Sequence, residues 1–316
     1  MPKSQVKRSN KKLKTDADWA FVRPHIWADS VEEFLSTAPK RALFDLIVTS
    51  PPYNIGKEYE KKKALSHYFL EQRTIIKGLV ERLKPSGSIC WQVGSYVSNG
   101  EVMPLDLEFH KIFRKLGLKL RNRIVWQFGH GLHSKRRFSG RYEVILWYTK
   151  GDNYPFNLNA VRVKSKYPGK LAYKGSKKGR YSSHPMGKNP EDVWSIPEDD
   201  VWSIPNVKAN HIEKTSHPCQ FPVGLVERLV LALTRKNGLV FDPYCGVASA
   251  GVAAVHHGRR FVGCERVKRY VKIGRERLDR ATRKQEPFRP HDKPIFDHTK
   301  SNLSVRTKRR IRATKK

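Results

Sequence analysis

Apolar and polar positions alternate along the first half of the chain in a way that predicts strands and helices in turn. Phe44–Thr49 is an apolar run interrupted only by Asp45, and it predicts a buried strand that ends at Pro51-Pro52, because proline cannot extend a ladder. His67–Leu83 has near-helical apolar spacing, and Lys84-Pro-Ser-Gly87 ends that predicted helix. Further predicted elements are the strand Ser88–Gly94, the helix Leu105–Leu116, and the strands Arg123–Phe128 and Tyr142–Tyr148. This alternation favours an α/β fold.

The periodicity disappears between Lys150 and Asn206, where Lys, Tyr, Gly, Ser and Pro predominate. Such a stretch is too long for an ordinary connection and predicts a functional insertion. Within it Asp192-Val-Trp-Ser-Ile-Pro197 recurs as Asp200–Pro205, but two copies cannot build a repeat fold, so we assign this duplication no chemistry. Order returns with a predicted βαβα unit, which comprises helix Pro222–Thr234, strand Gly238–Asp242, helix Ala248–His257, strand Arg260–Glu265 and helix Lys268–Arg280.

Composition points to a polyanionic partner. The 316 residues include 63 Lys and Arg against 29 Asp and Glu, for a formal net charge of +34, while 38% hydrophobic residues supply a core. Leu229–Leu233 is far too short an apolar run for a membrane span, and the basic start does not resemble a secretory signal, so we expect a protein of the cytosol or nucleoid. The four cysteines have no CxxC spacing, so neither a disulfide framework nor a structural metal is indicated.

The positive charge is concentrated in four windows that contain no acid. Residues 1–14 carry six basic side chains and residues 300–316 carry eight, as expected of mobile arms that bind phosphate or of solubilising tails. Lys119–Arg141 holds seven and Ala160–Pro190 holds nine, the latter interleaved with tyrosines. The predicted DNA-binding side chains in these two windows are Arg136, Arg137, Arg141, Lys164, Lys166, Lys174, Lys177, Lys178 and Arg180. A flexible solvated loop and ordinary exposed arginines are the alternative interpretations.

Phe241-Asp-Pro-Tyr-Cys-Gly246 places an acid and a glycine in the turn after a predicted strand, and small residues open the following helix. Backbone can approach a ligand closely at such a turn, although a tight turn can also need glycine for geometry alone. Glu265 ends the next predicted strand nineteen residues after Gly246, where a carboxylate can accept hydrogen bonds from ribose hydroxyls. No Walker phosphate loop is present, so the pattern predicts a nucleoside without phosphates.

A second loop, Thr49-Ser-Pro-Pro-Tyr-Asn54, follows the first predicted strand directly. It is either a rigid turn that ends the strand, a polyproline peptide ligand, or a catalytic loop; its place after a buried strand argues against the peptide ligand.

Together these motifs resemble the S-adenosylmethionine-dependent DNA amino-methyltransferases of the permuted class, in which the catalytic block precedes the cofactor block. The resemblance covers roughly residues 25–280 and includes Trp27-Ala-Asp-Ser30, Ser50-Pro-Pro-Tyr53, Lys84–Gly87, Lys214–Pro222, Phe241–Gly246 and Glu265. It implies a mostly parallel, circularly permuted, Rossmann-like methyltransferase sheet with a basic target-recognition insertion. One departure is Gly246-Val-Ala248, where the family usually has Gly-Ser-Gly.

The resemblance also implies residue roles. The catalytic group is Ser50, Pro51, Pro52 and Tyr53, and the cofactor group is Asp29, Lys214, His217, Phe221, Asp242, Pro243, Tyr244, Cys245, Gly246 and Glu265. Serine at the head of the loop is typical of N4-cytosine enzymes, and aspartate there is typical of N6-adenine enzymes. A hydroxyl and a carbonyl can accept the two amine hydrogens of a flipped base while an aromatic ring stacks on it, so direct methyl transfer needs no metal and no catalytic cysteine. His217 before proline can equally be a structural histidine at a helix start.

The expected organisation is a flexible basic arm (1–14), a catalytic half (15–150), a target-recognition insertion (151–206), a cofactor half of the same domain (207–285) and a basic tail (286–316). We expect a site-specific methyltransferase that acts on cytosine N4 in double-stranded DNA. Adenine N6, an RNA substrate, an inactive nucleic-acid-binding relative and a homodimer remain open, as does a role in restriction protection or in regulation.

Overall fold

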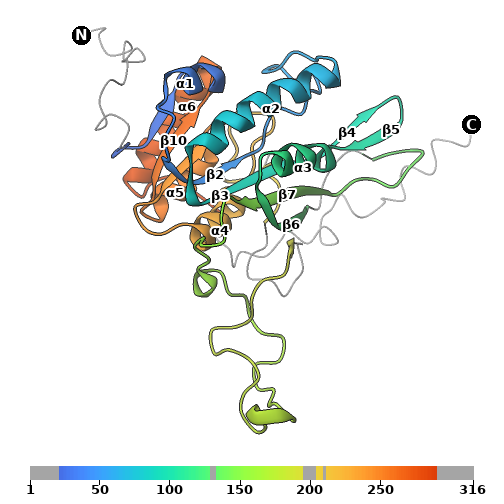
Figure 1. Ribbon diagram of the computed structural model, residues 1–316, viewed down its shortest axis with the longest axis vertical. Helices are drawn as coiled ribbons and strands as arrows, with labels where there is room; N and C mark the ends of the chain where they lie inside the picture. Colours follow the sequence, from blue (N-terminus) through green and yellow to red (C-terminus); the bar gives the residue numbers. More distant parts are fainter. Residues whose placement is uncertain (1–20, 129–132, 195–203, 209–210, 290–316) are drawn as a thin grey trace, which may run out of the picture.

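The computed structural model describes residues 21–128, 133–194, 204–208 and 211–289. These residues form an eight-stranded sheet with helices on both faces (Figure 1). The predicted basic N-terminal segment 1–14 lies outside the described residues, as do all but the first four residues of the predicted tail 286–316. In chain order the elements are β1 (His25–Trp27), α1 (Val31–Thr37), β2 (Phe44–Thr49), α2 (Leu65–Arg82), β3 (Leu83–Val93), β4 (Ser95–Ser98), β5 (Glu101–Pro104), α3 (Leu105–Lys115), β6 (Lys119–Gln127), β7 (Tyr142–Thr149), the 3₁₀ turns Leu158–Ala160 and Gly175–Lys177, β8 (Val193–Trp194), α4 (Val223–Leu233), β9 (Leu239–Asp242), α5 (Ser249–His256), β10 (Arg260–Cys264) and α6 (Lys268–Thr282).

The strand order in the large sheet is β1-β10-β9-β2-β3-β7-β6-β8. The first five strands of this order are parallel, β7 is antiparallel to both β3 and β6, and β8 is parallel to β6. The expected mostly parallel sheet is confirmed. Strands from both predicted halves of the chain share it, because β9, from the later half, pairs with β2, from the earlier half. The carboxyl ends of β1, β10, β9 and β2 therefore lie along one edge.

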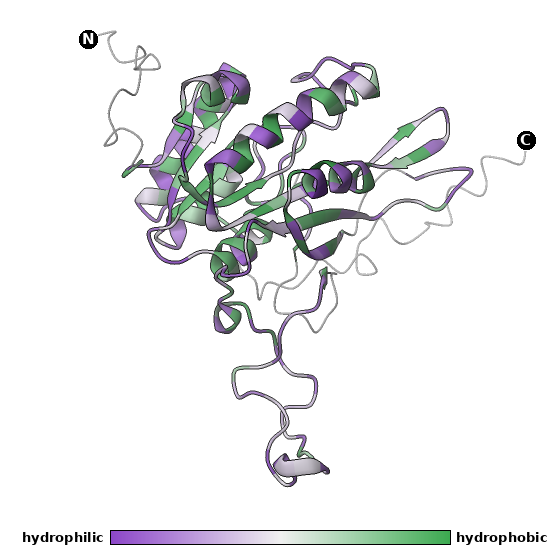
Figure 2. Ribbon diagram, in the orientation of Figure 1, coloured by the Kyte–Doolittle hydropathy of each residue, from purple (hydrophilic) through white to green (hydrophobic). Residues whose placement is uncertain are grey.

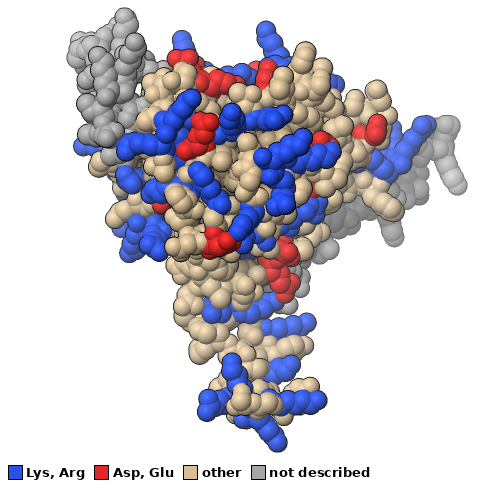
Figure 3. Space-filling model, viewed as in Figure 1, with Lys and Arg blue, Asp and Glu red and all other residues tan. Residues whose placement is uncertain are grey.

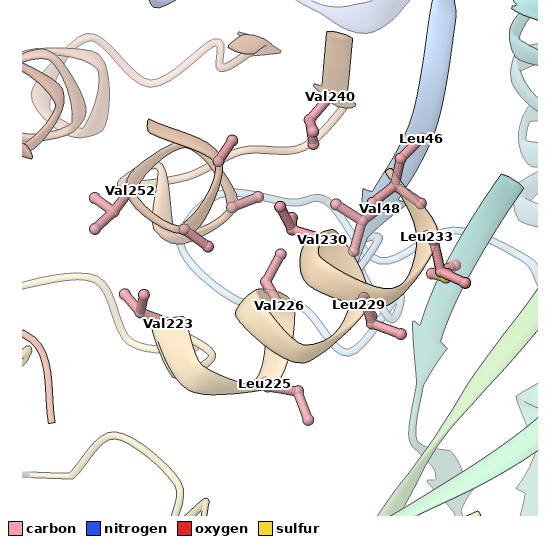
Figure 4. Close-up of a cluster of buried hydrophobic side chains, with 14 of the residues drawn as sticks. Leu46, Val48, Val223, Leu225, Val226, Leu229, Val230, Leu233, Val240 and Val252 are labelled. Carbon is pink, nitrogen blue, oxygen red and sulfur yellow. The ribbon is translucent and has the colours of Figure 1, made fainter. Parts of the chain in front are cut away.

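Two hydrophobic cores cover the two faces of the sheet. One lies under α1, α2 and α3, and the other lies under α4, α5 and α6. Helix α4 is apolar around most of its circumference, and Figure 4 shows its side chains packed against those of β2, β9 and α5. Figure 2 shows hydrophobic and hydrophilic positions alternating along α2 and α3, and the buried residues of these helices include Ile75, Leu79 and Phe109. This packing makes the sheet a rigid support for the loops at its edge.

Asp45, the polar residue that interrupts the apolar run of β2, links β2 to its two neighbouring strands, β9 and β3. Its Oδ2 accepts the Leu239 N–H at 2.8 Å, and both carboxylate oxygens accept from Lys84 Nζ at 2.8–2.9 Å. The sequence predicted that Lys84-Pro-Ser-Gly87 ends the helix His67–Leu83, and it did not predict the conformation of this segment. Helix α2 does end, at Arg82, but the segment lies within β3 as a bulge, because the pairing of β2 with β3 shifts between Phe44 and Leu46.

Three short features were not predicted from the sequence. These are the edge strand β1, the helix α1 and the β4–β5 hairpin. Helix α1 begins at the cap Ser30, whose Oγ accepts the Glu33 N–H at 3.2 Å. Each of these elements is too short to show a hydrophobic period.

The predicted insertion projects from the body as an extended arm, which we define as residues 161–190 (Figure 1). The outgoing and returning segments of the arm pair at two isolated antiparallel bridges, Val163↔Lys188 and Leu171↔Tyr181. The first copy of the duplicated segment supplies β8, which pairs with β6. Of the second copy only Ile204 and Pro205 are described, and the Ile204 carbonyl accepts the Trp126 indole N–H at 2.9 Å.

Candidate active site

The segments predicted to be the catalytic loop and the cofactor turn, which keep these names below, follow adjacent parallel strands. The Ser50-Pro-Pro-Tyr53 loop follows β2, the Asp242–Gly246 turn follows β9, and Glu265 follows β10. Together with Asp29 after β1, they open onto one cavity of about 1140 Å³. All predicted catalytic residues and all predicted cofactor residues except Asp242 line it, namely Asp29, Ser50, Pro51, Pro52, Tyr53, Lys214, His217, Phe221, Pro243, Tyr244, Cys245, Gly246 and Glu265.

The catalytic loop is held in one shape by its neighbours. The Tyr68 phenol donates to the Pro52 carbonyl at 2.7 Å. Asn54 adopts a left-handed backbone with φ +60°, which asparagine tolerates, and its side chain exchanges hydrogen bonds with the backbone of Lys63 at 2.7 and 2.8 Å. Two rigid prolines and these contacts leave the Ser50 hydroxyl at a defined position.

Ser50 and Tyr53 are linked to two residues that the sequence analysis did not identify. Ser50 Oγ lies 2.9 Å from Tyr53 Oη, which in turn donates to Glu143 Oε2 at 3.2 Å. Gln92 Nε2 donates to the same Glu143 oxygen at 2.6 Å. Burial raises the pKa of both the Tyr53 phenol and the Glu143 carboxyl. The signal available in the sequence was a single acid within the otherwise apolar strand Tyr142–Tyr148.

Gly94 allows this cluster to form. A Cβ at this position would lie 3.2 Å from Tyr53 Cε2 and 3.4 Å from Glu143 Oε1. A side chain there would crowd both groups, so the position directly after β3, beside the loop, requires a residue without a side chain.

The cofactor turn has the backbone that close ligand approach requires. Gly246 has φ +50°, and Ala248, the cap of α5, is left-handed at φ +63°. The Gly246 N–H donates to Glu265 Oε2 at 3.0 Å, and the Val267 N–H donates to Glu265 Oε1 at 2.7 Å. Each carboxylate oxygen retains a further acceptor site, so Glu265 joins the two loops and can still bind hydroxyl groups.

Asp242 is fully buried behind the turn and does not line the cavity. Its Oδ1 accepts from Thr49 Oγ1 at 2.6 Å and from the Tyr244 N–H at 3.1 Å, while Oδ2 has no hydrogen-bond partner among the described residues. Burial raises the pKa of this carboxyl to about 7. In this position Asp242 supports both loops.

His217 packs directly on the cofactor turn. A Cβ at Gly246 would lie 3.1 Å from His217 Nε2. The imidazole stacks on Tyr59 and meets Tyr270 edge-on, with ring centroids 5.7 and 4.5 Å away. Burial lowers the pKa of His217 to about 4, so the ring is neutral at pH 7. Lys214 reinforces this segment by donating to the His217 carbonyl at 2.8 Å.

The predicted DNA-binding residues lie away from the cavity. Arg136, Arg137 and Arg141 occupy the connection between β6 and β7, where Phe138 is fully exposed. The predicted cations of the arm lie on its surface, and Figure 3 shows Lys and Arg without acids at its far end. Lys166 and Lys174 lie over Tyr167 and Tyr173, with Nζ-to-centroid distances of 5.8 and 5.5 Å.

Within the described ranges, no cluster of three or more His, Cys, Asp or Glu is arranged to hold a metal ion, and the four cysteines are free thiols. No helix in the same ranges is long and apolar enough to cross a membrane.

Comparison with known proteins agrees with this arrangement. The chain is 47% identical over 230 residues to the Type II methyltransferase M.BglII of Bacillus subtilis, a match that covers 72% of this chain and 62% of M.BglII. It is 32% identical over 248 residues to the DNA adenine methyltransferase YhdJ of Escherichia coli K12, covering 75% of this chain and 77% of YhdJ. The PvuII DNA methyltransferase, named as cytosine-N4-specific, has the same fold, with a TM-score of 0.61 and 18% identity over 83% of this chain and 92% of the PvuII chain.

A family model described as DNA methylase, which covers N6 and N4 methyltransferases, matches residues 44–276. The match includes the catalytic loop, the arm and the cofactor turn. This chain therefore belongs to the N6/N4 DNA methylase family.

Proposed function

We propose that this protein is a site-specific DNA methyltransferase that uses S-adenosylmethionine to methylate the N4 amino group of a flipped cytosine. The observation that carries the proposal is the convergence of Ser50-Pro-Pro-Tyr53 and the Gly246 turn on one cavity. A loop that can bind an amine thus faces a turn that can bind a nucleoside.

The catalytic loop supplies what an exocyclic amine lacks. Its nitrogen lone pair is delocalised into the ring, so the amine is a poor nucleophile. The Ser50 hydroxyl and the Pro51 carbonyl accept the two amine hydrogens, which favours a pyramidal nitrogen with a directed lone pair. The Tyr53 ring stacks on the flipped base and offsets part of the few kcal/mol lost on unpairing. The fixed loop means that little reorganisation is required when the base arrives.

The residues around the cofactor turn fit S-adenosylmethionine. Gly246 provides backbone that a Cβ would obstruct, and Glu265 retains acceptor sites for ribose hydroxyls. In this assignment Asp29 lies near the adenine, and Lys214, His217 and Phe221 lie near the methionine end. When bound, the cofactor supplies an electrophilic methyl group on a sulfonium. Methyl transfer from this group to an amine requires no metal ion.

The arm and the β6–β7 connection are the proposed DNA-binding surface. Nine cations between Ala160 and Pro190, with no acid among them, suit a phosphate backbone, and the exposed tyrosines can contact bases. In this proposal residues 151–206 are the target-recognition region, residues 15–150 and 207–285 are the catalytic and cofactor halves of one domain, and the ends 1–14 and 286–316 add nonspecific affinity.

Adenine N6 is the second candidate target, because the relative YhdJ is named a DNA adenine methyltransferase. The adenine and cytosine amines both lie beside a ring nitrogen, so the same two acceptors can serve either. The serine at position 50 supports cytosine.

The experiment is to incubate the full chain with S-adenosylmethionine and unmethylated bacterial DNA, digest the DNA to nucleosides, and identify the products by mass spectrometry. N4-methylcytosine supports the proposal, and its absence with Ser50→Ala shows that the product depends on this loop. Detection of N6-methyladenine would change the assigned target base from cytosine to adenine and would leave the proposed mechanism unchanged. No modified nucleoside on DNA of varied sequence, despite cofactor binding, would overturn the activity.

A further inference from the structure

Glu143 lies at the end of a hydrogen-bond chain that begins at Ser50. Ser50 Oγ contacts Tyr53 Oη at 2.9 Å, and Tyr53 Oη contacts Glu143 Oε2 at 3.2 Å. Glu143 comes from β7, at the position paired with Trp126 of β6, and its side chain reaches the cavity beside the loop. The proposed function gives roles to Ser50 and Tyr53 but none to this half-buried carboxyl.

The direction of the chain follows from the chemistry of its end members. An ionised carboxylate can only accept hydrogen bonds, and the Gln92 amide already donates to Glu143 Oε2 at 2.6 Å. The Tyr53 O–H must therefore point toward Glu143, which leaves a lone pair of Tyr53 Oη free to accept the Ser50 O–H. With its own hydrogen directed at Tyr53, Ser50 presents only lone pairs to an incoming amine.

We propose that Glu143 is the terminal acceptor of this chain: it holds Ser50 as an acceptor toward the target amine and takes up the proton that the amine loses. The inference rests on the proposed methyltransferase function and applies equally to cytosine N4 and adenine N6. Glu143 acts through Tyr53 and Ser50, so it is a positioning residue.

The proton balance requires such an acceptor. Methylation forms one N–C bond from the amine lone pair and breaks one S–C bond whose electron pair goes to sulfur, so the positive charge moves to the nitrogen. The nitrogen then loses one proton. Along the chain Ser50 Oγ receives this proton and passes its own hydrogen to Tyr53 Oη, which passes its hydrogen to Glu143. Each oxygen gains one hydrogen and loses one, except at the carboxylate, which is neutralised and later returns the proton to water.

The surroundings of Glu143 suit a proton acceptor. Burial raises the pKa of Glu143, and the hydrogen bonds from Gln92 and Tyr53 oppose this shift only in part. Gln92 of β3 and Trp126 of β6 are neutral, and within the described part of the chain the titratable groups facing the cluster are Tyr53 itself and the Cys219 thiol beside it. A carboxylate of raised pKa binds a proton more readily than an exposed one.

Glu143→Gln is the first test, because it keeps the shape of the side chain but removes the obligatory acceptor. A glutamine amide can donate to Tyr53, which reverses the chain and turns the Ser50 hydrogen toward the amine. We expect kcat to fall by about 100-fold or more, with unchanged KM for DNA and unchanged cofactor affinity. In the wild type the acidic limb of the kcat–pH profile should follow ionisation of Glu143, and in the variant that limb should vanish.

Tyr53→Phe tests the middle link while keeping the stacking ring. It should lower kcat about as much as Glu143→Gln, and the double variant should lose little more than either single one, because both break the same chain. Glu143→Asp should recover part of kcat and restore the acidic limb. Glu108→Gln is the matched control, since it removes a carboxylate of α3 that lies outside the cavity and contacts Lys111, and it should leave kcat unchanged.

A wild type that methylates DNA, together with a Glu143→Gln variant that keeps kcat within about threefold and keeps the acidic limb, would overturn the inference. Additive losses in the double variant would also overturn it. A wild type that methylates no DNA would instead contradict the proposed function. If Glu143→Gln fails to fold, Glu143→Asp and Tyr53→Phe carry the same comparison.

Discussion

Thr49 Oγ1 donates a 2.6 Å hydrogen bond to Oδ1 of Asp242, a residue 193 positions away in the sequence. Thr49 is the last residue of β2 and Asp242 is the last residue of β9, so this bond joins the strand ends from which the catalytic loop and the cofactor turn emerge. The same carboxylate oxygen accepts the Tyr244 N–H within the cofactor turn. The relative position of the two loops therefore depends on one buried carboxyl.

Thr49→Val should separate this bond from the packing of the side chain. The valine fills nearly the same volume but leaves the buried Asp242 carboxyl without one donor, so we expect a loss of about 1–3 kcal/mol in the free energy of unfolding. Cofactor affinity should fall as well, because the turn loses its anchor. Denaturant titration and calorimetric binding measure the two effects. Thr49→Ser retains the hydroxyl, and a loss of cofactor affinity as large in Thr49→Ser would argue against the hydrogen bond as the cause.

Asp242 should make stability depend on pH between about 4 and 7. Burial raises the pKa of its carboxyl from the ordinary 3.8 to about 7 in the folded state, so folding favours the protonated form. The stability from this group is fully present below about pH 4 and is lost as pH rises through about 7, a change of about 4 kcal/mol. Asp242→Asn stays neutral and should lack this slope. His217 contributes in the opposite direction at acidic pH, so the check is the difference between wild-type and variant unfolding curves, and parallel curves would contradict the assignment.

Gly246→Ala should impair cofactor binding more than its backbone strain alone explains. The alanine would sit at φ +50° with its Cβ 3.1 Å from His217 Nε2, so the imidazole or the turn must move. Gly258→Ala is the matched control, because it has φ +68° but nothing within 4 Å of the added carbon. Both variants should lose about 1–2 kcal/mol of stability. We expect only Gly246→Ala to weaken cofactor binding, by about tenfold or more in calorimetry. A double variant that also carries His217→Ala should recover part of the lost cofactor affinity.

The central strands and the loops after them were predictable because they are encoded locally. Phe44–Thr49 matches β2 residue for residue, since a strand buried on both faces reads as an apolar run. The glycine turn and Glu265 carry their meaning in residue type and spacing, and both line the cavity. By contrast, the three residues of β1 pair with β10 from the far end of the chain, a contact that no local pattern contains.

Glu143 shows why part of the site could not be found from the sequence. Its role depends on β7 lying antiparallel beside β3, which brings it within hydrogen-bond distance of Tyr53, 90 positions away. Asp242 shows the converse case. Its place in the motif predicted contact with the cofactor, a role that stays a prediction, while the structure shows a buried carboxyl that accepts a hydrogen bond from Thr49 and does not line the cavity.

Ser50→Ala and Tyr53→Ala should lower turnover strongly while leaving cofactor affinity largely intact. Both side chains lie on the catalytic loop, whereas Gly246 and Glu265 belong to other loops that line the same cavity and are joined by a hydrogen bond. Loss of one acceptor for the amine should reduce kcat by about 100- to 1000-fold. Single-turnover methylation and calorimetric titration with S-adenosylmethionine measure the two quantities. An equal loss of cofactor binding in either variant would contradict the division between the two loops.

Neutralising the end of the arm should weaken DNA binding without affecting the chemistry. The variant replaces Lys174, Lys177, Lys178 and Arg180 by alanine. It removes four exposed cations of the arm, none of which lines the cavity that contains the catalytic residues. If each contacts a phosphate, the slope of log affinity against log salt should become shallower by about 3 to 4. Turnover at saturating DNA should remain close to the wild-type value, because the four residues are absent from the site.

The matched control for the arm removes the same charge from the helical body. Arg73 and Lys77 are exposed on α2, Lys272 is exposed in the first half of α6, and Arg283 is exposed directly after α6. Their replacement by alanine changes the net charge by the same amount. Nonspecific attraction would fall in both variants, but only the arm variant should lose binding steeply and with a changed salt slope. Equal losses in the two variants, measured by fluorescence anisotropy across salt concentrations, would mean that the arm contributes bulk charge and makes no contacts of its own.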